Sequence, residues 1–200
     1  MQRPDPIARI IAALELPGGP STDFDLNPDV HLPQGRVLRP ASVLIPLQLV
    51  NGRAELILTK RSARLKHHPG QIAFPGGKQD DGDASAVAAA LREAQEEIGL
   101  PPELVQVLGA LPTHETVTGY VITPILGLVR AAFDEVPEAG EVDEVFRVPL
   151  DHVINPASFR VEARRWQGRR RYYYAVPYGP YYIWGATARI LRALAERVAR

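Results

Sequence analysis

Residues 92–100, Arg-Glu-Ala-Gln-Glu-Glu-Ile-Gly-Leu, constrain this chain more than any other segment. If the segment is helical up to Gly99, then Glu93, Glu96 and Glu97 lie on one face within about one turn. Carboxylates at this spacing repel each other, and negative charge near a helix C-terminus is also unfavourable. A positive partner is therefore expected. A hard divalent cation such as Mg²⁺ prefers carboxylate oxygens, and an ion held in this way commonly carries phosphate.

The residues around the glutamates predict a helix with clear ends. Asp83 and Ser85 are candidate N-caps, and Gly99, which is followed by Leu100 and two prolines, is a stop signal. The opposite face carries an apolar stripe for packing on a core. Its residues are Val87, Ala90, Leu91, Ala94 and Ile98. The alternative is a solvated amphipathic helix in which Arg92 merely pairs with Glu96 at i+4.

Length and composition restrict the class of protein. Two hundred residues suit a single domain, and Lys plus Arg and Asp plus Glu both total 23. This balance gives no general attraction to nucleic acid or to anionic membranes. Because no apolar run is long enough for a membrane span and residues 1–6 do not resemble a signal peptide, a cytoplasmic protein is expected. The absence of cysteine excludes disulfides, thiol catalysis and cysteine-ligated zinc.

The hydrophobic pattern predicts an α+β domain in which helices pack on a mixed or largely antiparallel sheet. Asn51-Gly52, a strong turn signal, separates predicted strands at 43–50 and 54–59. Residues 17–40 contain five prolines and are expected to be extended and irregular. The other expected elements are helices at 5–16 and 186–199, strands at 105–111 and 120–129, an apolar run at 145–150, and a hairpin of 159–166 and 171–176 around Gln167-Gly168.

The acidic segment and the residues before it resemble the sequence box of the Nudix hydrolases, which cleave nucleoside diphosphates linked to another group. The matching residues, in order, are Gly77, Asp83, Arg92-Glu93, Glu96-Glu97, Gly99 and Leu100. Two departures occur, since the usual loop glutamate is Asp83 and the interval from Asp83 to Arg92 is one residue longer. The resemblance implies an α/β/α sandwich with a mixed sheet packed between helices.

The longer interval is also what the coenzyme A diphosphatase branch of this family shows. A second motif of that branch lies upstream and reads here as residues 58–62, Lys66, Gly70 and residues 74–77. The branch usually has arginine at the position of Lys66, so the charge is kept but bidentate phosphate recognition is not. Further similar blocks lie at 117–120 with Pro124, at 141–146 and at 183–188. The resemblance covers about residues 36–195, which makes 1–35 an N-terminal extension of one domain over 1–200.

The resemblance implies metal-dependent attack of water on a phosphoanhydride phosphorus. Glu93 and Glu97 would be the main ligands of Mg²⁺ or Mn²⁺, with Glu96 completing the cluster or acting as the general base. Arg92 would orient a glutamate by a charge-assisted hydrogen bond. Glu141 or Glu144, in the acidic loop at 134–144, is the other candidate for the base or a further ligand. A solvated loop is the alternative for each of these two residues.

The implied substrate is coenzyme A, with acyl or oxidised forms as further options, and the products are 3′,5′-ADP and 4′-phosphopantetheine. Coenzyme A carries an extra 3′-phosphate, and a cluster of basic residues before the glycine loop would contact the phosphates or the pantetheine arm. These residues are Arg61, Arg64, Lys66, His67 and His68. Gly76-Gly77 would allow close approach of the main chain to metal or diphosphate. The alternatives are a solvated junction for the basic cluster and a simple tight turn for the glycines.

Two rival functions remain at this stage. Within the same fold, the substrate would be ADP-ribose or a dinucleotide. In another class, the chain would be a nucleotide- or RNA-binding module that has lost hydrolysis, although no glutamate of the box is missing. Arginines at 160–171 followed by tyrosines at 172–182 keep RNA open, because interleaved Arg and Tyr stack on bases. Packing aromatics of a hairpin are the preferred interpretation, so nucleic acid is not expected. The oligomeric state stays open, with a homodimer as one option.

Overall fold

The computed structural model describes residues 5–30, 35–166 and 168–200. None of the helices in these residues is long and apolar enough to cross a membrane. Two short 3₁₀ turns lie at Pro102–Leu104 and Pro156–Ser158. In chain order the α-helices and strands are α1 (Pro6–Leu14), β1 (Ser21–Thr22), β2 (Arg39–Val50), β3 (Arg53–Arg61), β4 (Ile72–Ala73), β5 (Gly76–Lys78), α2 (Ala86–Ile98), β6 (Val105–Ala110), β7 (His114–Glu115), β8 (Tyr120–Val129), β9 (Val142–Pro149), α3 (Leu150–Val153), β10 (Arg160–Trp166), β11 (Arg169–Ala175) and α4 (Ala186–Val198).

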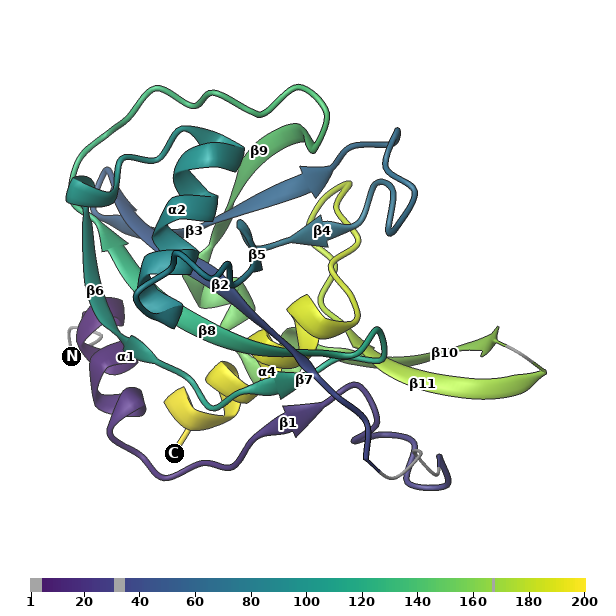
Figure 1. Ribbon diagram of the computed structural model, residues 1–200. Helices are drawn as coiled ribbons and strands as arrows, with labels where there is room; N and C mark the ends of the chain where they lie inside the picture. Colours follow the sequence, from purple (N-terminus) through teal and green to yellow (C-terminus); the bar gives the residue numbers. More distant parts are fainter. Residues whose placement is uncertain (1–4, 31–34, 167) are drawn as a thin grey trace.

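Strand β2 lies at the centre of a mixed sheet (Figure 1). Along one edge it is parallel to β8 over nearly its whole length. Along the other edge it is antiparallel first to β5, up to Val43, and then to β3, from Leu47 onward. Strands β9 and β4 pair with β3, β6 and β7 pair with β8, and β1 pairs with β7. The second neighbour of β2 therefore changes in mid-strand, and the glycine loop and β3 share one edge.

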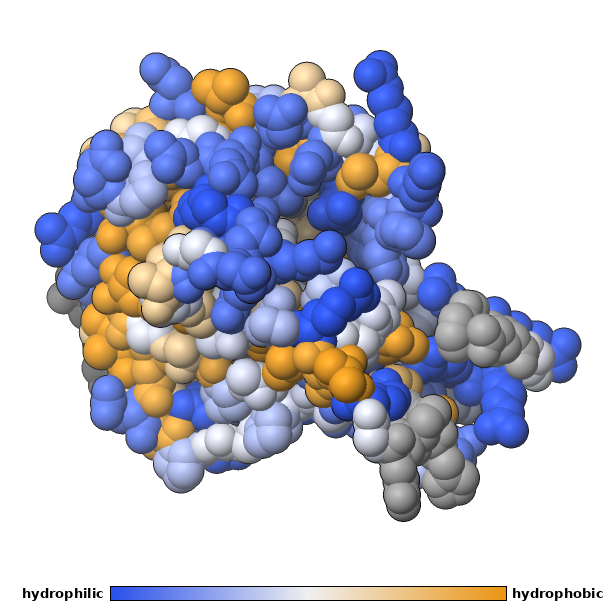
Figure 2. Space-filling model, viewed as in Figure 1, coloured by the Kyte–Doolittle hydropathy of each residue, from blue (hydrophilic) through white to orange (hydrophobic). Residues whose placement is uncertain are grey.

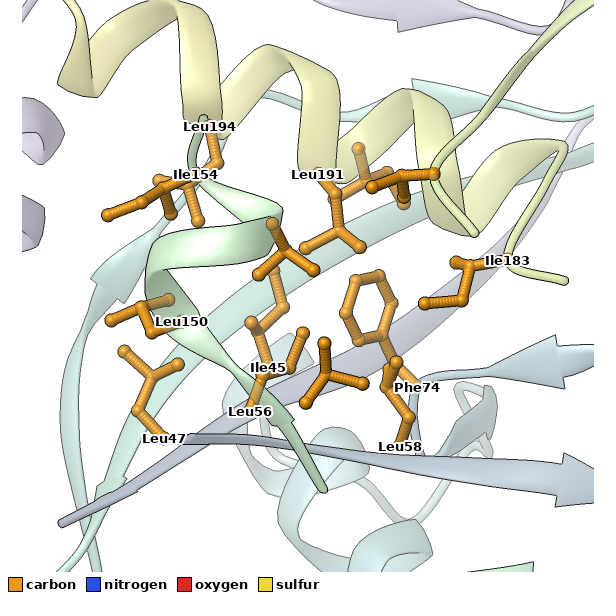
Figure 3. Close-up of a cluster of buried hydrophobic side chains, with 14 of the residues drawn as sticks. Ile45, Leu47, Leu56, Leu58, Phe74, Leu150, Ile154, Ile183, Leu191 and Leu194 are labelled. Carbon is orange, nitrogen blue, oxygen red and sulfur yellow. The ribbon is translucent and has the colours of Figure 1, made fainter. Parts of the chain in front are cut away.

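Helices cover both faces of this sheet. Because side chains alternate along a strand, Leu44 of β2 and Ile57 of β3 face α2, while Ile45 and Leu56 face the opposite way. Figure 3 shows that second core, where the sheet residues meet Leu191, Leu194 and Ile154 from α4 and the end of α3. Helix α1 packs beside α4. The predicted α+β sandwich, a mixed sheet between helices, is confirmed.

The ends of α2 follow the sequence signals. The Ser85 hydroxyl accepts the amide of Ala88 at 3.1 Å, and Gly99 closes the helix in the left-handed conformation with φ 72°. Asp83, the other N-cap candidate, binds Arg92 instead. Ala90, Ala94 and Ile98 of the predicted stripe are fully buried, whereas Val87 and Leu91 are partly buried. The three glutamates lie on a neighbouring face of α2, on which Glu97 is buried as well.

The proline-rich segment 17–40 is more regular than expected, because it contains β1 and the first residues of β2. The Ser21 amide donates to the carbonyl of Thr113, and the fully buried His114 ring contacts the Ser21 hydroxyl at 2.9 Å and the Asp23 carboxylate at 3.2 Å. These bonds hold β1 against β7, a two-residue strand inside the expected loop 112–116. Residues 31–34 of the segment lie outside the described residues.

The predicted second hairpin forms β10 and β11, although Gln167 of its turn lies outside the described residues. The two strands make a separate sheet that projects from the rest of the chain (Figure 1). Figure 2 shows a hydrophilic surface on this projection, at the right of the view. At its base the Arg164 guanidinium lies 4.5 Å from the centre of the Trp184 ring. Part of the arginine and aromatic content thus serves contacts within the hairpin and its base.

The N-terminal helix is fastened to the C-terminal helix by one buried side chain. Arg197 of α4 is 7% exposed and donates from Nε to the Ala13 carbonyl and from Nη2 to the Leu14 carbonyl, both at 3.0 Å. It also donates to the carbonyl of Leu16. The last carbonyls of a helix have no partner within that helix. Arg197 therefore caps the C-terminus of α1 from the far end of the chain.

Candidate active site

The glycine loop lies against the second half of α2. The amide of Gly76 donates to a carboxylate oxygen of Glu97 at 2.9 Å and so joins the two segments. Glu97 is 5% exposed. Burial raises its pKa to about 7, whereas the Gly76 amide and the charge of Arg61 act in the opposite direction. A carboxylate buried in this way is a group that a nearby cation stabilises.

Glu93, about one turn earlier on α2, rests on the second glycine of the loop. A Cβ atom added at Gly77 would lie 2.6 Å from the carboxylate atoms of Glu93, well inside contact distance. Burial also raises the pKa of Glu93, and Arg92 partly offsets this rise. The main chain of Gly76 and Gly77 thus lies directly against two of the three glutamates.

Arg92 binds several carboxylates at once. Its guanidinium makes two bonds to Asp83, at 3.0 and 2.9 Å, and Nη1 reaches Glu93 at 3.0 Å and Glu96 at 2.9 Å. It also donates to the carbonyl of Lys78 at 3.2 Å. The bonds from Arg92 lower the pKa of Asp83 to about 2. The pair with Glu96 at i+4 is therefore one part of a larger network, in which Arg92 orients two glutamates and ties the loop before α2 to the helix.

Carboxylate oxygens are the donor type that Mg²⁺ and Mn²⁺ prefer, so Glu93, Glu96 and Glu97 fit such an ion chemically. The raised pKa values of Glu93 and Glu97 agree with this, because both carboxylates are desolvated beside like charges. In the described part of the chain, however, no three acidic or histidine side chains converge closely enough to hold an ion. Two of the glutamates are bonded to Arg92 and the third to Gly76.

The basic segment after β3 reaches the same end of the sheet. The Ser62 amide donates to the carbonyl of Glu141 at 2.8 Å, and the Ala63 amide donates to the Asp143 carboxylate at 2.9 Å. The charge of Arg61 acts on Glu97. Within the described residues, the side chains of Arg64 and Lys66 are exposed and make no hydrogen bond or ion pair, and the backbone amide of Arg64 donates to the Ser62 hydroxyl at 3.3 Å. His68 has a positive φ of 55° and, through burial and the charge of Arg61, a lowered pKa.

The two acidic-loop candidates lie on different faces of the sheet. Glu141 is exposed, and its charge raises the pKa of both Glu93 and Glu97. Glu144 pairs in register with Lys60 and accepts the hydroxyl of Tyr181 at 2.5 Å, on the face covered by α4. Only Glu141 is therefore turned toward the α2 glutamates.

Among the described residues, two of the hollows bear on where a small molecule could bind. One, of about 390 Å³, lies beside the ends of β3 and β9 and is lined by Lys60, Glu144 and aromatic residues of the loop before α4. The other, of about 580 Å³, lies at the opposite end of β2 and β3, near Asn51 and Arg147. The larger hollow contains none of the site residues expected from the sequence. The smaller one adjoins the basic segment through Gly70.

The structure brings together the α2 glutamates, Arg92, Gly76, Gly77 and Arg61. It leaves Arg64 and Lys66 in an exposed loop, and within the described residues neither side chain bonds to any of them. Sequence reasoning gave no role to Lys60 or to the aromatic wall of the smaller hollow. The signal for Lys60 was its place next to Arg61 in an alternating strand, and the wall residues fall inside the similar block at 183–188 and the tyrosines just before it.

Comparison with known proteins gives consistent results. A family model described as the NUDIX domain matches residues 38–172. A Citrobacter koseri protein named as an uncharacterized Nudix hydrolase, NudL, is 42% identical over 160 residues, which cover 80% of this chain and 83% of that protein. A protein of the same name from Pectobacterium atrosepticum is 43% identical over 179 residues, which cover 89% and 92% respectively.

Solved structures agree in fold. The crystal structure of a Nudix hydrolase from M. smegmatis, RenU, superposes with a TM-score of 0.50 at 25% identity, over 60% of this chain and 83% of that chain. A MutT/nudix family protein from Enterococcus faecalis has a TM-score of 0.51 at 15% identity, over 86% and 66%. The second likeness concerns the fold alone.

Proposed function

Since this chain belongs to the Nudix family of hydrolases, we propose that it cleaves the diphosphate of coenzyme A with the help of Mg²⁺ or Mn²⁺. The products are 3′,5′-ADP and 4′-phosphopantetheine. Family membership accounts for hydrolysis of a phosphoanhydride bond. The choice of coenzyme A is the further step, and it rests on the residues that precede the glutamate box.

One observation carries this choice. The hydrogen bond from Gly76 to Glu97 joins the upstream motif to the glutamate helix, and Arg61 of that motif acts electrostatically on the same glutamate. These contacts support the proposal that the two motifs that resemble the coenzyme A branch belong to one site. The diphosphate of such a substrate needs cationic partners, and the exposed Arg64 and Lys66 follow Arg61 in the same motif.

The side chains suggest a division of labour. Glu93, Glu96 and Glu97 would hold the metal, which when bound neutralises the diphosphate and acidifies a water molecule. Arg92 positions Glu93 and Glu96 through its hydrogen bonds. Gly77 has no side chain where the Glu93 carboxylate lies, and the amide of Gly76 donates to Glu97. Arg61, Arg64 and Lys66 bind phosphate oxygens of the substrate.

We propose Glu96 or Glu141 as the general base. Glu144 is engaged by Tyr181 on the other face of the sheet, which favours Glu141 as the acidic-loop candidate. Glu96 is exposed and accepts one hydrogen bond from Arg92, so a water molecule can reach its carboxylate. Both carboxylates lie on the side where the metal would be bound.

The experiment is a comparison of substrates with the purified chain and Mg²⁺. We expect coenzyme A to be hydrolysed with a higher kcat/KM than ADP-ribose, and EDTA to stop the reaction. In Glu97→Gln the rate should fall about 100-fold or more, because a ligand is lost while the carboxylate volume is kept. Glu103→Gln, an exposed glutamate just after α2, is the matched control and should keep full activity.

Faster hydrolysis of ADP-ribose or of a dinucleotide would refute the substrate assignment and leave the reaction class intact. Full activity of Glu97→Gln, or turnover that persists in EDTA, would remove the glutamate cluster and its metal from the mechanism. A folded protein that binds nucleotides and hydrolyses none of them would support the non-hydrolytic alternative.

A further inference from the structure

The hollow of about 390 Å³ lies across the sheet from the glutamate helix. Its lining includes Lys60 from β3 and Glu144 from β9. Three aromatic residues of the loop before α4 complete it, namely Tyr181, Tyr182 and Trp184. In Figure 1 the loop before α4 rises beside β4 and forms this side of the molecule. The volume falls within the usual range of small-ligand sites, about 300–1,000 Å³.

The aromatic wall of the hollow is held in place by its own contacts. The Tyr181 ring stacks on Phe146, with 3.6 Å between ring centres and 9° between planes. The Tyr182 hydroxyl donates to Glu162 at 2.5 Å. Trp184 is flanked by the Arg164 guanidinium and the Tyr173 ring. Rings fixed in this way offer flat, rigid surfaces, which bind another planar ring at low entropic cost.

A single cation lines the same hollow. In the stretches 5–30, 35–166 and 168–200, the side chain of Lys60 makes no hydrogen bond or ion pair, although its charge acts on Asp143 and Glu144 is its register partner on β9. Glu144 is already engaged by the Tyr181 hydroxyl. The ammonium of Lys60 is therefore available to an anionic ligand. The combination of a fixed aromatic wall with a free ammonium suits a purine ring that carries a phosphate.

The strand geometry connects this hollow to the cleavage site. Lys60 and Arg61 are the last two residues of β3, where the pairing with β9 shifts its register. Arg61 acts on Glu97 on the α2 face, and Lys60 lines the hollow on the α4 face. A substrate whose diphosphate lies at the glutamates would therefore reach the hollow past this end of β3.

We propose that this hollow binds the 3′-phosphoadenosine end of the substrate, with the base against Tyr182 and Trp184 and the 3′-phosphate near Lys60. The inference rests on the proposed cleavage of coenzyme A and names which half of that molecule enters which part of the site. The pantetheine half then leaves the glutamates in the other direction. A purine can stack on a rigid aromatic wall, whereas the flexible pantetheine chain has no ring that could stack there.

The test uses binding, so it does not depend on turnover. The chain has two tryptophans, and Trp166→Phe leaves Trp184 as the single fluorophore. Titration of this variant with 3′,5′-ADP should quench its fluorescence, because the base stacks beside Trp184. Tyr182→Leu and Lys60→Met, each added to that background, should weaken 3′,5′-ADP binding by about 10-fold, the loss expected for one stacking or charged contact.

The matched control is Tyr172→Leu, which removes a tyrosine of similar exposure, 39% against 40% for Tyr182, from a position outside the hollow. Its affinity for 3′,5′-ADP should equal that of the background variant. Quenching by 4′-phosphopantetheine rather than by 3′,5′-ADP would overturn the inference and assign the hollow to the other half of coenzyme A. Equal affinities in all variants would also overturn it.

The two proposals fail in different ways. If coenzyme A is hydrolysed normally while Tyr182→Leu and Lys60→Met leave its KM unchanged and 3′,5′-ADP does not quench, the hollow is wrongly assigned and the substrate is right. If 3′,5′-ADP binds as described but coenzyme A is not hydrolysed, the hollow is a purine nucleotide site and the proposed substrate is wrong.

Discussion

At the scale of single residues, Gly77 is required because a carboxylate occupies the space of its missing side chain. A Cβ atom there would lie 2.6 Å from the carboxylate atoms of Glu93. We expect Gly77→Ala to push Glu93 out of place and to lower kcat on coenzyme A by about 10–100-fold, the usual cost of displacing a supporting residue of a metal site. Steady-state kinetics at saturating Mg²⁺ measure this loss.

Gly82→Ala is the natural control, since a Cβ atom at Gly82 meets no atom within 4 Å and the residue lies in the same loop region. Its kinetics should match those of the unmodified chain. The melting temperature of Gly77→Ala should stay close to the original value, because the displaced side chain can turn toward water. A large drop in melting temperature with unchanged kcat would mean that Gly77 serves packing rather than the site.

At the scale of elements, the attachment of α1 depends on Arg197. Its bonds to the carbonyls of Ala13, Leu14 and Leu16 replace the partners that a helix C-terminus lacks. Arg197→Met keeps the aliphatic stem but leaves these buried carbonyls unpaired, so we expect a loss of about 2–4 kcal/mol in the free energy of unfolding. Urea denaturation followed by circular dichroism gives this quantity.

Arg200→Met serves as the comparison, because Arg200 is exposed and its side chain donates to the Pro17 carbonyl at the long distance of 3.4 Å. Its effect should stay within about 0.5 kcal/mol, as for other surface substitutions. Amide exchange in α1 should speed up in Arg197→Met alone. Equal stabilities of the two variants would show that α1 is held by its apolar face, without the arginine.

Local signals predicted the elements that depend on neighbours in sequence. Asn51-Gly52 forms the turn between β2 and β3, with positive φ at both residues, and Ser85 and Gly99 bound α2. Strands β1 and β7 were not predicted, because each has only two residues and forms by pairing with a distant segment. Proline-rich composition concealed β1, while β7 looked like a connecting loop.

The same division holds for the candidate site. The glutamate face could be predicted because Glu93, Glu96 and Glu97 follow from the period of one helix. The helical period could not predict the bonds of Arg92 to Asp83, which lies across a loop. It also could not predict the neighbours of Lys60. Contacts between residues far apart in the chain depend on sheet register and on loop paths, which hydrophobic periodicity does not encode.

At the scale of the whole molecule, we expect metal binding to stabilise the chain. The glutamates of α2 repel each other without a cation, so an ion that binds only the folded state shifts the unfolding equilibrium. At a Mg²⁺ concentration about 100 times the Kd, the gain is about 2.7 kcal/mol, which corresponds to a rise in Tm of about 5–10 °C. Calorimetry with and without Mg²⁺ measures it.

The rise should be absent in Glu97→Gln and present in Glu103→Gln. Sodium chloride at equal ionic strength separates specific binding from screening, and it should change the Tm little. An equal rise in both variants would place the stabilising ion away from the glutamate cluster.

We also propose that residues 1–200 act as one domain. Helix α1 packs on α4, and β1 pairs with β7, so the N-terminal elements belong to the same layers as the rest of the fold.

The pairing of β2 has a consequence for how the chain reaches its native state. Its hairpin with β3 forms across a two-residue turn. Its other edge can pair only after β8 has been made, because Arg39 pairs with Tyr120 and Gln48 with Val129. Such non-local parallel pairing is slow and leaves an open edge in the meantime. During synthesis, the glutamate helix therefore leaves the ribosome before the sheet beneath it is complete. A chaperone that binds the nascent chain, or a ribosome that stalls in that interval, would therefore meet α2 before its glutamates are packed on the sheet.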